Sequence, residues 1–248
     1  MEHGIGRQFM AQTRYRFLQP SDQNRGLPQP PLQQDYDRSR PLIDLPRPET
    51  VQVETVALRQ AIEARRSVRR YSQTPLSLAE LSFLLWCTQG VKEIASRAVT
   101  LRTVPSAGAR HAFETYLLVN NVDGLVPGVY RFLALEHKLI EVDLSPGIAD
   151  LVTEACWRQQ FVKASAVTFI WVAVAYRMTW RYGERGYRYL HLDAGHVCQN
   201  LYLAAEAVHC GVCAIAAFND EAMNELLELD GEEQFVIYLA TLGKRDSS

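Results

Sequence analysis

The sequence lacks an excess of charge of either sign and has no long apolar run. Its 26 Lys and Arg residues nearly balance 28 Asp and Glu residues, which leaves a formal net charge of −2 over 248 residues. A chain so close to neutrality has no general attraction for polyanions, so a nucleic-acid partner is not expected. No stretch approaches the ~20 consecutive apolar residues of a membrane-spanning helix. With 48% hydrophobic residues, near the globular average, the sequence predicts a soluble globular protein without a membrane partner.

Cysteine is scarce, and its spacing indicates no disulfide framework. The five residues are an odd number and lie in apolar or helix-like segments. Cys210 and Cys213 form a single Cys-x-x-Cys pair, which the pattern places at the end of a long helix. A redox pair would need a helix N-terminus, so we interpret both as packed thiols. The first residues contain no continuous apolar segment of a secretory signal. The sequence therefore predicts a reducing, cytoplasmic location.

Proline is concentrated near the start of the chain. Seven of the eleven prolines fall between Pro20 and Pro48, among several glutamines. This composition predicts an extended arm over residues 1–49 that is not a core element, followed by a folded domain over residues 50–248. The arm is either a linker or a segment that lies along a partner subunit, and the sequence leaves both open.

Helical patterns recur through the domain. Apolar residues from Val53 to Ile62 have helical spacing and predict a first helix that begins near Thr50 and ends near the arginines at 65–70. Ser77 to Glu80 has the form of a capping box, and Gly90 is placed to end the helix that follows. A long helix is predicted over residues 189–210, and a short one after Asn219 or Asp220.

Strand patterns lie between and after these helices. Residues 112–119 predict one strand, and residues 128–135 and 138–142 predict a hairpin. Residues 166–175 are almost wholly apolar, which is typical of a strand covered on both faces. A last strand is predicted over residues 235–242. Because helices and strands do not alternate regularly, the fold class is α+β.

Three features carry candidate binding chemistry. Arg65, Arg66, Ser67 and Arg69 lie in the segment RRSVRRY, where guanidinium groups could hold a phosphate, although an arginine cluster is also typical of a solvated face. Gly243, Lys244 and Arg245 end the last predicted strand and could equally form a charged tail. The third feature is the segment of Pro105, Ser106, Ala107 and Gly108. Its small side chains would let backbone amides approach a flat ligand, but the segment could equally be a plain turn.

These features, in this order, resemble the nitroreductase superfamily of flavin mononucleotide (FMN) enzymes, over about residues 50–246. Residues 105–119 and 182–205, together with parts of the arm, are similar to the SagB-type dehydrogenase branch. The resemblance implies a mainly antiparallel central sheet flanked by helices, and an entwined homodimer with FMN at each interface. It also implies NADH or NADPH as a possible reductant. Some members of the branch oxidise thiazolines and oxazolines in peptides, while the wider superfamily reduces nitroaromatics and quinones.

The resemblance also implies roles for individual residues. Arg65 and Ser67 would hold the phosphate and ribityl end of FMN, and Arg69 would approach the pyrimidine edge of the ring. The loop from Pro105 to Gly108 would reach the flavin of the other subunit. Two further pairs complete the implied site: Ala216 and Ala217, whose backbone would face flavin N5, and Lys244 and Arg245, which would bind the phosphate.

The candidate catalytic pair is Arg181 and Tyr182. It matches a lysine–tyrosine pair of the azoline oxidases, but an arginine replaces the lysine and cannot readily accept a proton. The expected substrate is therefore a nitroaromatic, a quinone or another small organic molecule, with a peptide azoline or a non-catalytic flavin-binding role as alternatives. His191 and His196, five residues apart, would diverge on a helix, so no metal site is predicted.

Overall fold

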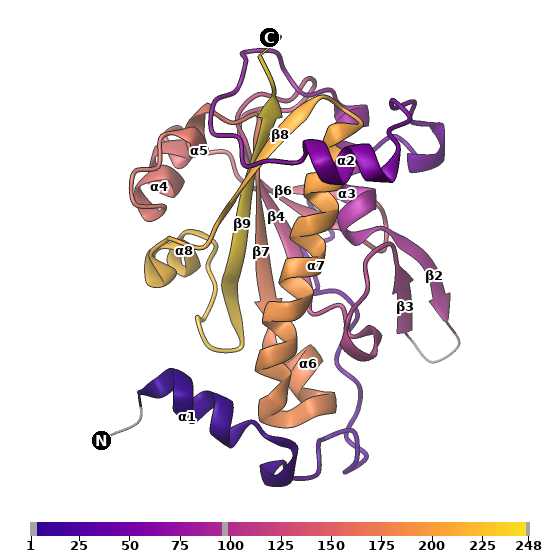
Figure 1. Cartoon of the computed structure of the whole chain (residues 1–248), viewed down its shortest axis with the longest axis vertical. Coiled ribbons are helices and arrows are strands. Elements are labelled where there is room, and N and C mark those ends of the chain that lie inside the picture. The colour runs from indigo at the N-terminus through magenta and orange to yellow at the C-terminus, as the bar shows by residue number, and fades with distance from the viewer. Residues whose placement is uncertain (1–3, 96–98, 247–248) are drawn as a thin grey trace.

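The computed structural model describes residues 4–95 and 99–246 and shows a seven-stranded sheet covered by helices on both faces (Figure 1). The strand order is β1-β6-β5-β4-β7-β9-β8, and every neighbouring pair is antiparallel. The expectation of an α+β fold with a mainly antiparallel central sheet is confirmed. The strands of this sheet are β1 Leu42–Asp44, β4 Phe113–Val119, β5 Gly128–Leu133, β6 Lys138–Asp143, β7 Val167–Val174, β8 Cys210–Ile215 and β9 Gln234–Lys244.

The apolar strand β7 lies inside the sheet, between β4 and β9, and is buried along its whole length. Because strand side chains alternate between faces, Phe169 and Trp171 join one apolar cluster while Ile170 and Val172 join another. The first cluster contains side chains of α3 Leu78–Gln89 and α7 Gly186–Glu206, and the second contains those of α4 Ile148–Ala155 and α8 Asp220–Leu226. The sheet is therefore the middle layer between two sets of helices.

Local sequence signals predicted several elements correctly. Ser77 and Glu80 form the capping box of α3, with Ser77 Oγ accepting from the Glu80 N–H at 3.2 Å, and α3 ends at Gly90. The Asn219 side chain caps α8. The predicted long helix is α7, and the hairpin of β5 and β6 turns at His137, which has a positive φ of 54°.

Two expectations were wrong in detail. The first helix is only α2, Leu58–Ala64, and Arg65 is already its C-terminal cap with extended backbone. Arg65 and Arg69 therefore do not share a helix face. Cys210 and Cys213 lie on strand β8, not at a helix end, because α7 stops at Glu206. Both thiols are buried, as the packed interpretation required.

Other elements had no clear sequence signal. They include the β2–β3 hairpin, which stands apart from the central sheet, and the short helices between β6 and α7. Their bounds are β2 Val91–Ala95, β3 Val99–Arg102, α5 Phe161–Ala164 and α6 Ala175–Tyr182, and single 3-10 turns lie at Tyr15–Phe17, Pro48–Thr50, Ala107–Ala109 and Gly183–Arg185. No helix in the described ranges is both long enough and apolar enough to cross a bilayer.

The arm has more structure than the sequence predicts. It contains α1, Ile5–Gln12, and β1, which pairs with β6 as the edge strand of the central sheet. Leu45, just after β1, is buried in the main apolar cluster. The last part of the arm is therefore a core element, which corrects the expectation for these residues.

Candidate active site

The arginine segment lies against strand β8. The Val68 N–H donates to the Val212 carbonyl at 2.9 Å, and Ser67 forms a parallel bridge with Val212. Such close approach is possible because residue 211 is glycine: a Cβ there would lie 2.5 Å from the Cβ of Val68. The strand and the segment after α2 therefore bring Ser67 to the end of the sheet that also holds the chain terminus.

Tyr202 of α7 connects this segment to β8. Its hydroxyl lies 3.1 Å from Ser67 Oγ and accepts from the Ala214 N–H at 2.9 Å. The Arg65 guanidinium stacks 5.2 Å from the centre of the Tyr202 ring. The sequence analysis did not select Tyr202, because a tyrosine on an apolar helix face looks like a packing residue until its partners are known.

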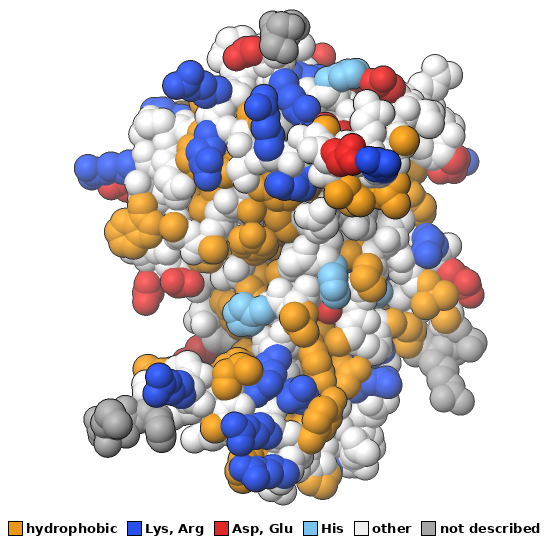
Figure 2. Space-filling view, viewed as in Figure 1, with side chains coloured by type: hydrophobic (Ala, Val, Ile, Leu, Met, Phe, Trp, Pro, Cys, Tyr) orange, Lys and Arg blue, Asp and Glu red, His pale blue; other side chains and the backbone are white. Residues whose placement is uncertain are grey.

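The arginines form an uncompensated group of positive charge. Arg66, Arg69 and Arg70 are exposed, Arg65 is half-buried, and within the described ranges none of the four forms an ion pair. Lys and Arg side chains gather at the top of the face shown in Figure 2, above an apolar depression. Guanidinium groups without carboxylate partners are suited to bind an anion.

The terminal cations lie beside this group but already have partners. The Ser72 N–H donates to the Lys244 carbonyl at 2.9 Å, which places the two segments side by side. Lys244 pairs with Glu80, and Arg245 pairs with Glu206 and donates to the Cys210 carbonyl at 3.0 Å. Burial alone would raise the pKa of Glu80, but hydrogen bonds from Lys244 and Ser77 outweigh burial and lower it. Gly243 faces Gly211 in the ladder between β8 and β9.

The predicted Ala216–Ala217 segment follows the other end of β8. Both residues are exposed, and the Ala217 carbonyl accepts from Gln159 Nε2 at 2.9 Å. Cys210, beside the terminal cations, is six residues from Ala216, which corresponds to about 20 Å of extended strand. Strand β8 thus connects the cation cluster to the exposed backbone of Ala216 and Ala217.

The Pro105–Gly108 loop lies elsewhere in the chain. The Ala107 N–H points at the Asp193 carboxylate, 3.2 Å from either oxygen. Burial raises the pKa of Asp193, while hydrogen bonds from Ser106 and Ala107 act in the opposite direction. Asp193 is nine residues before Tyr202 on α7, so the loop is displaced by about 14 Å along the helix from the Ser67 contact. The loop and the cation cluster thus lie on the same helix-covered side of the chain but contact different parts of α7.

The candidate catalytic pair lies with this loop. Gly108 has a positive φ of 57°, and a Cβ on it would be 2.5 Å from the Tyr182 hydroxyl and 2.8 Å from Arg181 Nε. The Tyr182 ring packs edge-on against Tyr189, with 4.7 Å between ring centres. Tyr189 in turn lies 2.8 Å, hydroxyl to hydroxyl, from Tyr15 of the arm. The arm thus contacts the aromatic group that supports the pair.

Within residues 4–95 and 99–246, no group of three or more His, Cys, Asp or Glu side chains could hold a metal ion. His191 Nδ1 donates to the Tyr187 carbonyl of its own helix at 2.8 Å, and both His191 and His196 are exposed.

Sequence comparison identifies the family. The model of the Nitroreductase family matches residues 62–244. A nitroreductase-family protein of Methanocaldococcus jannaschii is 34% identical over 193 residues, which cover 78% of this chain and 93% of that protein. The trifolitoxin-processing protein TfxB of Rhizobium leguminosarum is 29% identical over 133 residues, and the match covers 52% of this chain but only 36% of TfxB.

Solved structures give the same result. A nitroreductase-family structure from Anabaena variabilis has a TM-score of 0.64 and 31% identity, with 76% of this chain and 38% of that chain covered. Two structures below 25% identity share the fold alone: a Desulfovibrio desulfuricans protein in complex with FMN, with a TM-score of 0.54, and the Escherichia coli microcin synthetase complex, with a TM-score of 0.58. Fold and sequence agree, and the chain belongs to the nitroreductase family.

Proposed function

We propose that this protein is an FMN-dependent oxidoreductase that exchanges hydride through flavin N5. It would reduce nitroaromatic or quinone-like acceptors with NADH or NADPH, or oxidise a small organic substrate. The observation that carries the proposal is the group of Arg65, Arg66 and Arg69 around Ser67, which has no acidic partner among the described residues and lies at one end of β8. The exposed Ala216–Ala217 backbone lies at the other end.

The residues fit a phosphorylated flavin. Unpaired guanidinium groups and the Ser67 hydroxyl would bind the phosphate and ribityl oxygens, and Lys244 and Arg245, each already paired with a glutamate, lie close by. Arg69, stacked 5.8 Å from the Phe161 ring centre, would face the pyrimidine edge. FMN, when bound, supplies the two-electron chemistry, while the protein orients the ring and excludes water from it.

The loop and the catalytic pair would come from the second subunit of a homodimer. This assignment follows from the resemblance to the family, in which the loop reaches the flavin of the other subunit. Tyr182, beside Gly108, would donate or accept a proton at its hydroxyl. Arg181 would stabilise negative charge at the site, because a guanidinium group does not readily release a proton.

Arg65→Ala tests the binding site. The variant removes charge-assisted hydrogen bonds worth about 1.5–3 kcal/mol each, so its FMN affinity should fall about tenfold or more. Arg59→Ala is the matched control, because Arg59 lies on α2, is exposed and pairs with Glu63 at 2.8 Å. FMN content is measured by absorbance after heat release, and the fold by circular dichroism.

The wild-type protein should be yellow and should consume NADH or NADPH with menadione or a nitroarene. A colourless protein that binds no added FMN would reject the proposal. Equal FMN affinity of Arg65→Ala and Arg59→Ala would reject the assignment of Arg65. Bound FMN without electron transfer to any acceptor would favour a non-catalytic flavin-binding role.

A second candidate is oxidation of peptide azolines. It is favoured by the likeness to the trifolitoxin-processing protein and to the microcin synthetase complex. The arginine at position 181 weighs against it, since the expected base is a lysine. A peptide product lighter by two hydrogen atoms, detected by mass spectrometry, would distinguish this activity from general reduction.

A further inference from the structure

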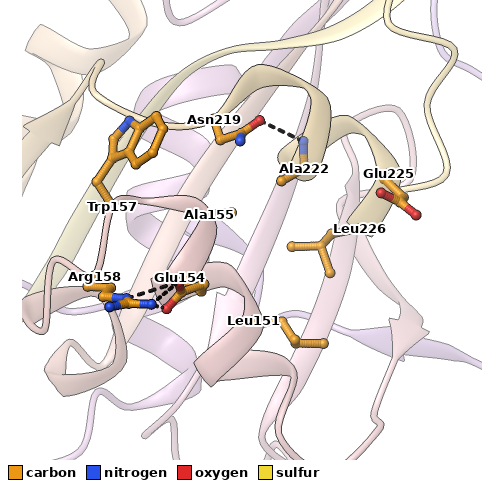
Figure 3. A pocket seen from close by; sticks show the side chains of 9 residues that line it. All are labelled: Leu151, Glu154, Ala155, Trp157, Arg158, Asn219, Ala222, Glu225 and Leu226. Carbon is orange, nitrogen blue, oxygen red and sulfur yellow. Dashed lines mark hydrogen bonds and ion pairs between the residues drawn. The ribbon is translucent and has the colours of Figure 1, made fainter.

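A groove of about 630 Å³ separates α4 from α8 on the outer layer of the molecule (Figure 3). Its floor is apolar and is formed by Leu151, Ala155, Ala222 and Leu226. The volume exceeds that of one side chain and lies in the range of sites that hold drug-sized ligands. None of the residues assigned above to the flavin lines this groove.

The indole of Trp157 borders the groove and is held in an unusual backbone conformation. Trp157 and Arg158 follow α4 with positive φ values of 54° and 57°, a region that bulky residues rarely adopt. Trp157 nevertheless remains 63% exposed, so the indole gains little packing in return. Strained, exposed aromatic residues at a groove are expected where a ligand contacts them.

The charges around the groove favour a cation. Glu154 is neutralised by Arg158, with 2.8 Å between their closest atoms. Glu225 lies across the groove from Trp157, and its carboxylate has no ionic or hydrogen-bonding partner in the described part of the chain. An indole face and an unpaired carboxylate both attract ammonium and guanidinium groups.

The groove adjoins the proposed redox site. Gln159, two residues after Trp157, donates from Nε2 to the carbonyls of Cys156 and Ala217, at 2.9 Å each. Asn219 caps α8, lines the groove and lies two residues after Ala217. A chain bound in the groove could therefore continue toward Ala216 and Ala217.

We propose that the groove binds a peptide segment in which a lysine or arginine lies next to an apolar residue. One basic side chain contacts the Trp157 face and another contacts the Glu225 carboxylate across the groove, and the apolar side chains between them pack against Leu151 and Leu226. An extended peptide presents both groups at neighbouring positions and spans the groove, which a small amine does not. The inference rests on the proposed function in one respect, that the peptide leads to the flavin site, where the second candidate activity would act on it.

The test measures binding by fluorescence anisotropy with three fluorescein-labelled hexapeptides, in which leucine alternates with lysine, glutamine or glutamate. The leucine–lysine peptide should bind the full-length protein at least several-fold more tightly than the other two. Glu225→Gln should weaken it about three- to fivefold, and Trp157→Ala at least as much. Glu221→Gln is the matched control, because Glu221 lies on the same helix and is exposed but does not line the groove.

Trp157→Gly separates binding from folding. Glycine suits the positive φ at this position, so the variant should unfold at the same or a higher urea concentration while it loses peptide affinity. A clear loss of stability would instead mean that the indole is a packing residue, and would overturn the proposal. Equal affinity for the three peptides, or no effect of Glu225→Gln, would also overturn it.

Flavin absorbance keeps the two proposals apart. All groove variants should retain FMN, because they lie outside the cation cluster. If FMN binds and the lysine peptide does not, the groove proposal fails alone. If the peptide binds and FMN does not, the proposed redox function fails, and the groove stands as a peptide site.

Discussion

At Gly211, the absence of a side chain decides whether the arginine segment can reach β8. A Cβ there would overlap the Val68 side chain, with 2.5 Å to Cβ and 2.7 Å to Cγ1. Both atoms belong to a short branched side chain next to the Val68–Val212 hydrogen bond, so the segment itself would have to move. Ser67 and Arg65 depend on that contact for their position beside Tyr202.

In Gly211→Ala, the loss of binding free energy for FMN should therefore exceed the loss of free energy of unfolding. The loss should be about tenfold or more, since displacement of Ser67 and Arg65 removes at least one charge-assisted bond. The double variant Gly211→Ala, Val68→Gly removes every overlapping side-chain atom, the Val68 Cβ included, and should recover part of the affinity. FMN titration of both proteins measures the difference, and a double variant as weak as the single one would contradict this explanation.

His111 gives the fold a defined dependence on pH. Burial, together with the neighbouring charge of Arg102, lowers its pKa from about 6.5 to about 3. The folded chain thus keeps His111 neutral, while the unfolded chain binds a proton below about pH 6.5. The free energy of unfolding must therefore fall as the pH drops from about 6.5 to about 3, by up to about 1.4 kcal/mol per pH unit for one proton.

His111→Asn should remove that part of the acid sensitivity. Asparagine tolerates the positive φ of 44° at this position and does not titrate. Urea unfolding at pH 7, 6, 5 and 4 should show wild type losing stability faster than the variant as the pH falls. Parallel losses in both proteins would mean that His111 does not set the slope.

Among the elements, the arm is held chiefly by side chains of the domain that donate to its backbone. Arg177 donates to the Pro31 carbonyl at 2.8 Å, and Arg131 donates to the carbonyls of Gln34 and Asp35. The Gln34 N–H donates to Glu114, which also pairs with Arg177. Arg177 and Glu114 are both almost fully buried, so the arm seals a charged pair inside the fold.

Arg177→Met should lower the free energy of unfolding by about 3–5 kcal/mol, because it leaves Glu114 buried without its partner. Arg158→Met is the control, since the Arg158–Glu154 pair is exposed, is screened by solvent and should contribute little to stability. Urea unfolding measures both. Hydrogen exchange at residues 32–35 should rise in Arg177→Met alone, and an equal effect of the two changes would contradict the role assigned to Arg177.

At the scale of the whole molecule, the proposed site is divided between two regions of the chain. The cation cluster with β8 forms one region, and the Pro105–Gly108 loop with Arg181 and Tyr182 forms the other. The proposal joins them across two subunits. This arrangement has a consequence that a site within one chain does not share.

A heterodimer of Arg65→Ala and Gly108→Val chains should bind one FMN. Each variant alone should bind FMN weakly. Arg65→Ala lacks a phosphate-binding charge, and valine at position 108 overlaps Tyr182 and Arg181. In the heterodimer, one site combines the intact loop of the first chain with the intact Arg65 of the second. Co-expressed, doubly tagged protein and flavin absorbance give the stoichiometry. If no FMN is recovered, loop and cations belong to the same chain.

Much of the fold follows from local patterns in the sequence. The period of apolar residues predicts α7, the continuous apolar run predicts β7, and Ser77 with Glu80 predicts the start of α3, because each signal depends on neighbours a few residues apart. Strand β8 and the edge strand β1 escaped prediction. Their sequences are short, and only pairing with distant β9 and β6 defines them.

The candidate site divides in the same way. The residue types that could bind a phosphorylated flavin were visible from the sequence, since charge and side-chain size are local properties. Which of them lie together depends on contacts between residues far apart in the chain, such as Ser67 with Tyr202 and Ala107 with Asp193. The amino-acid sequence by itself determined the chemistry available to this protein, and only the tertiary structure decided which groups converge, because convergence is set by packing across the sheet and not by neighbours along the chain.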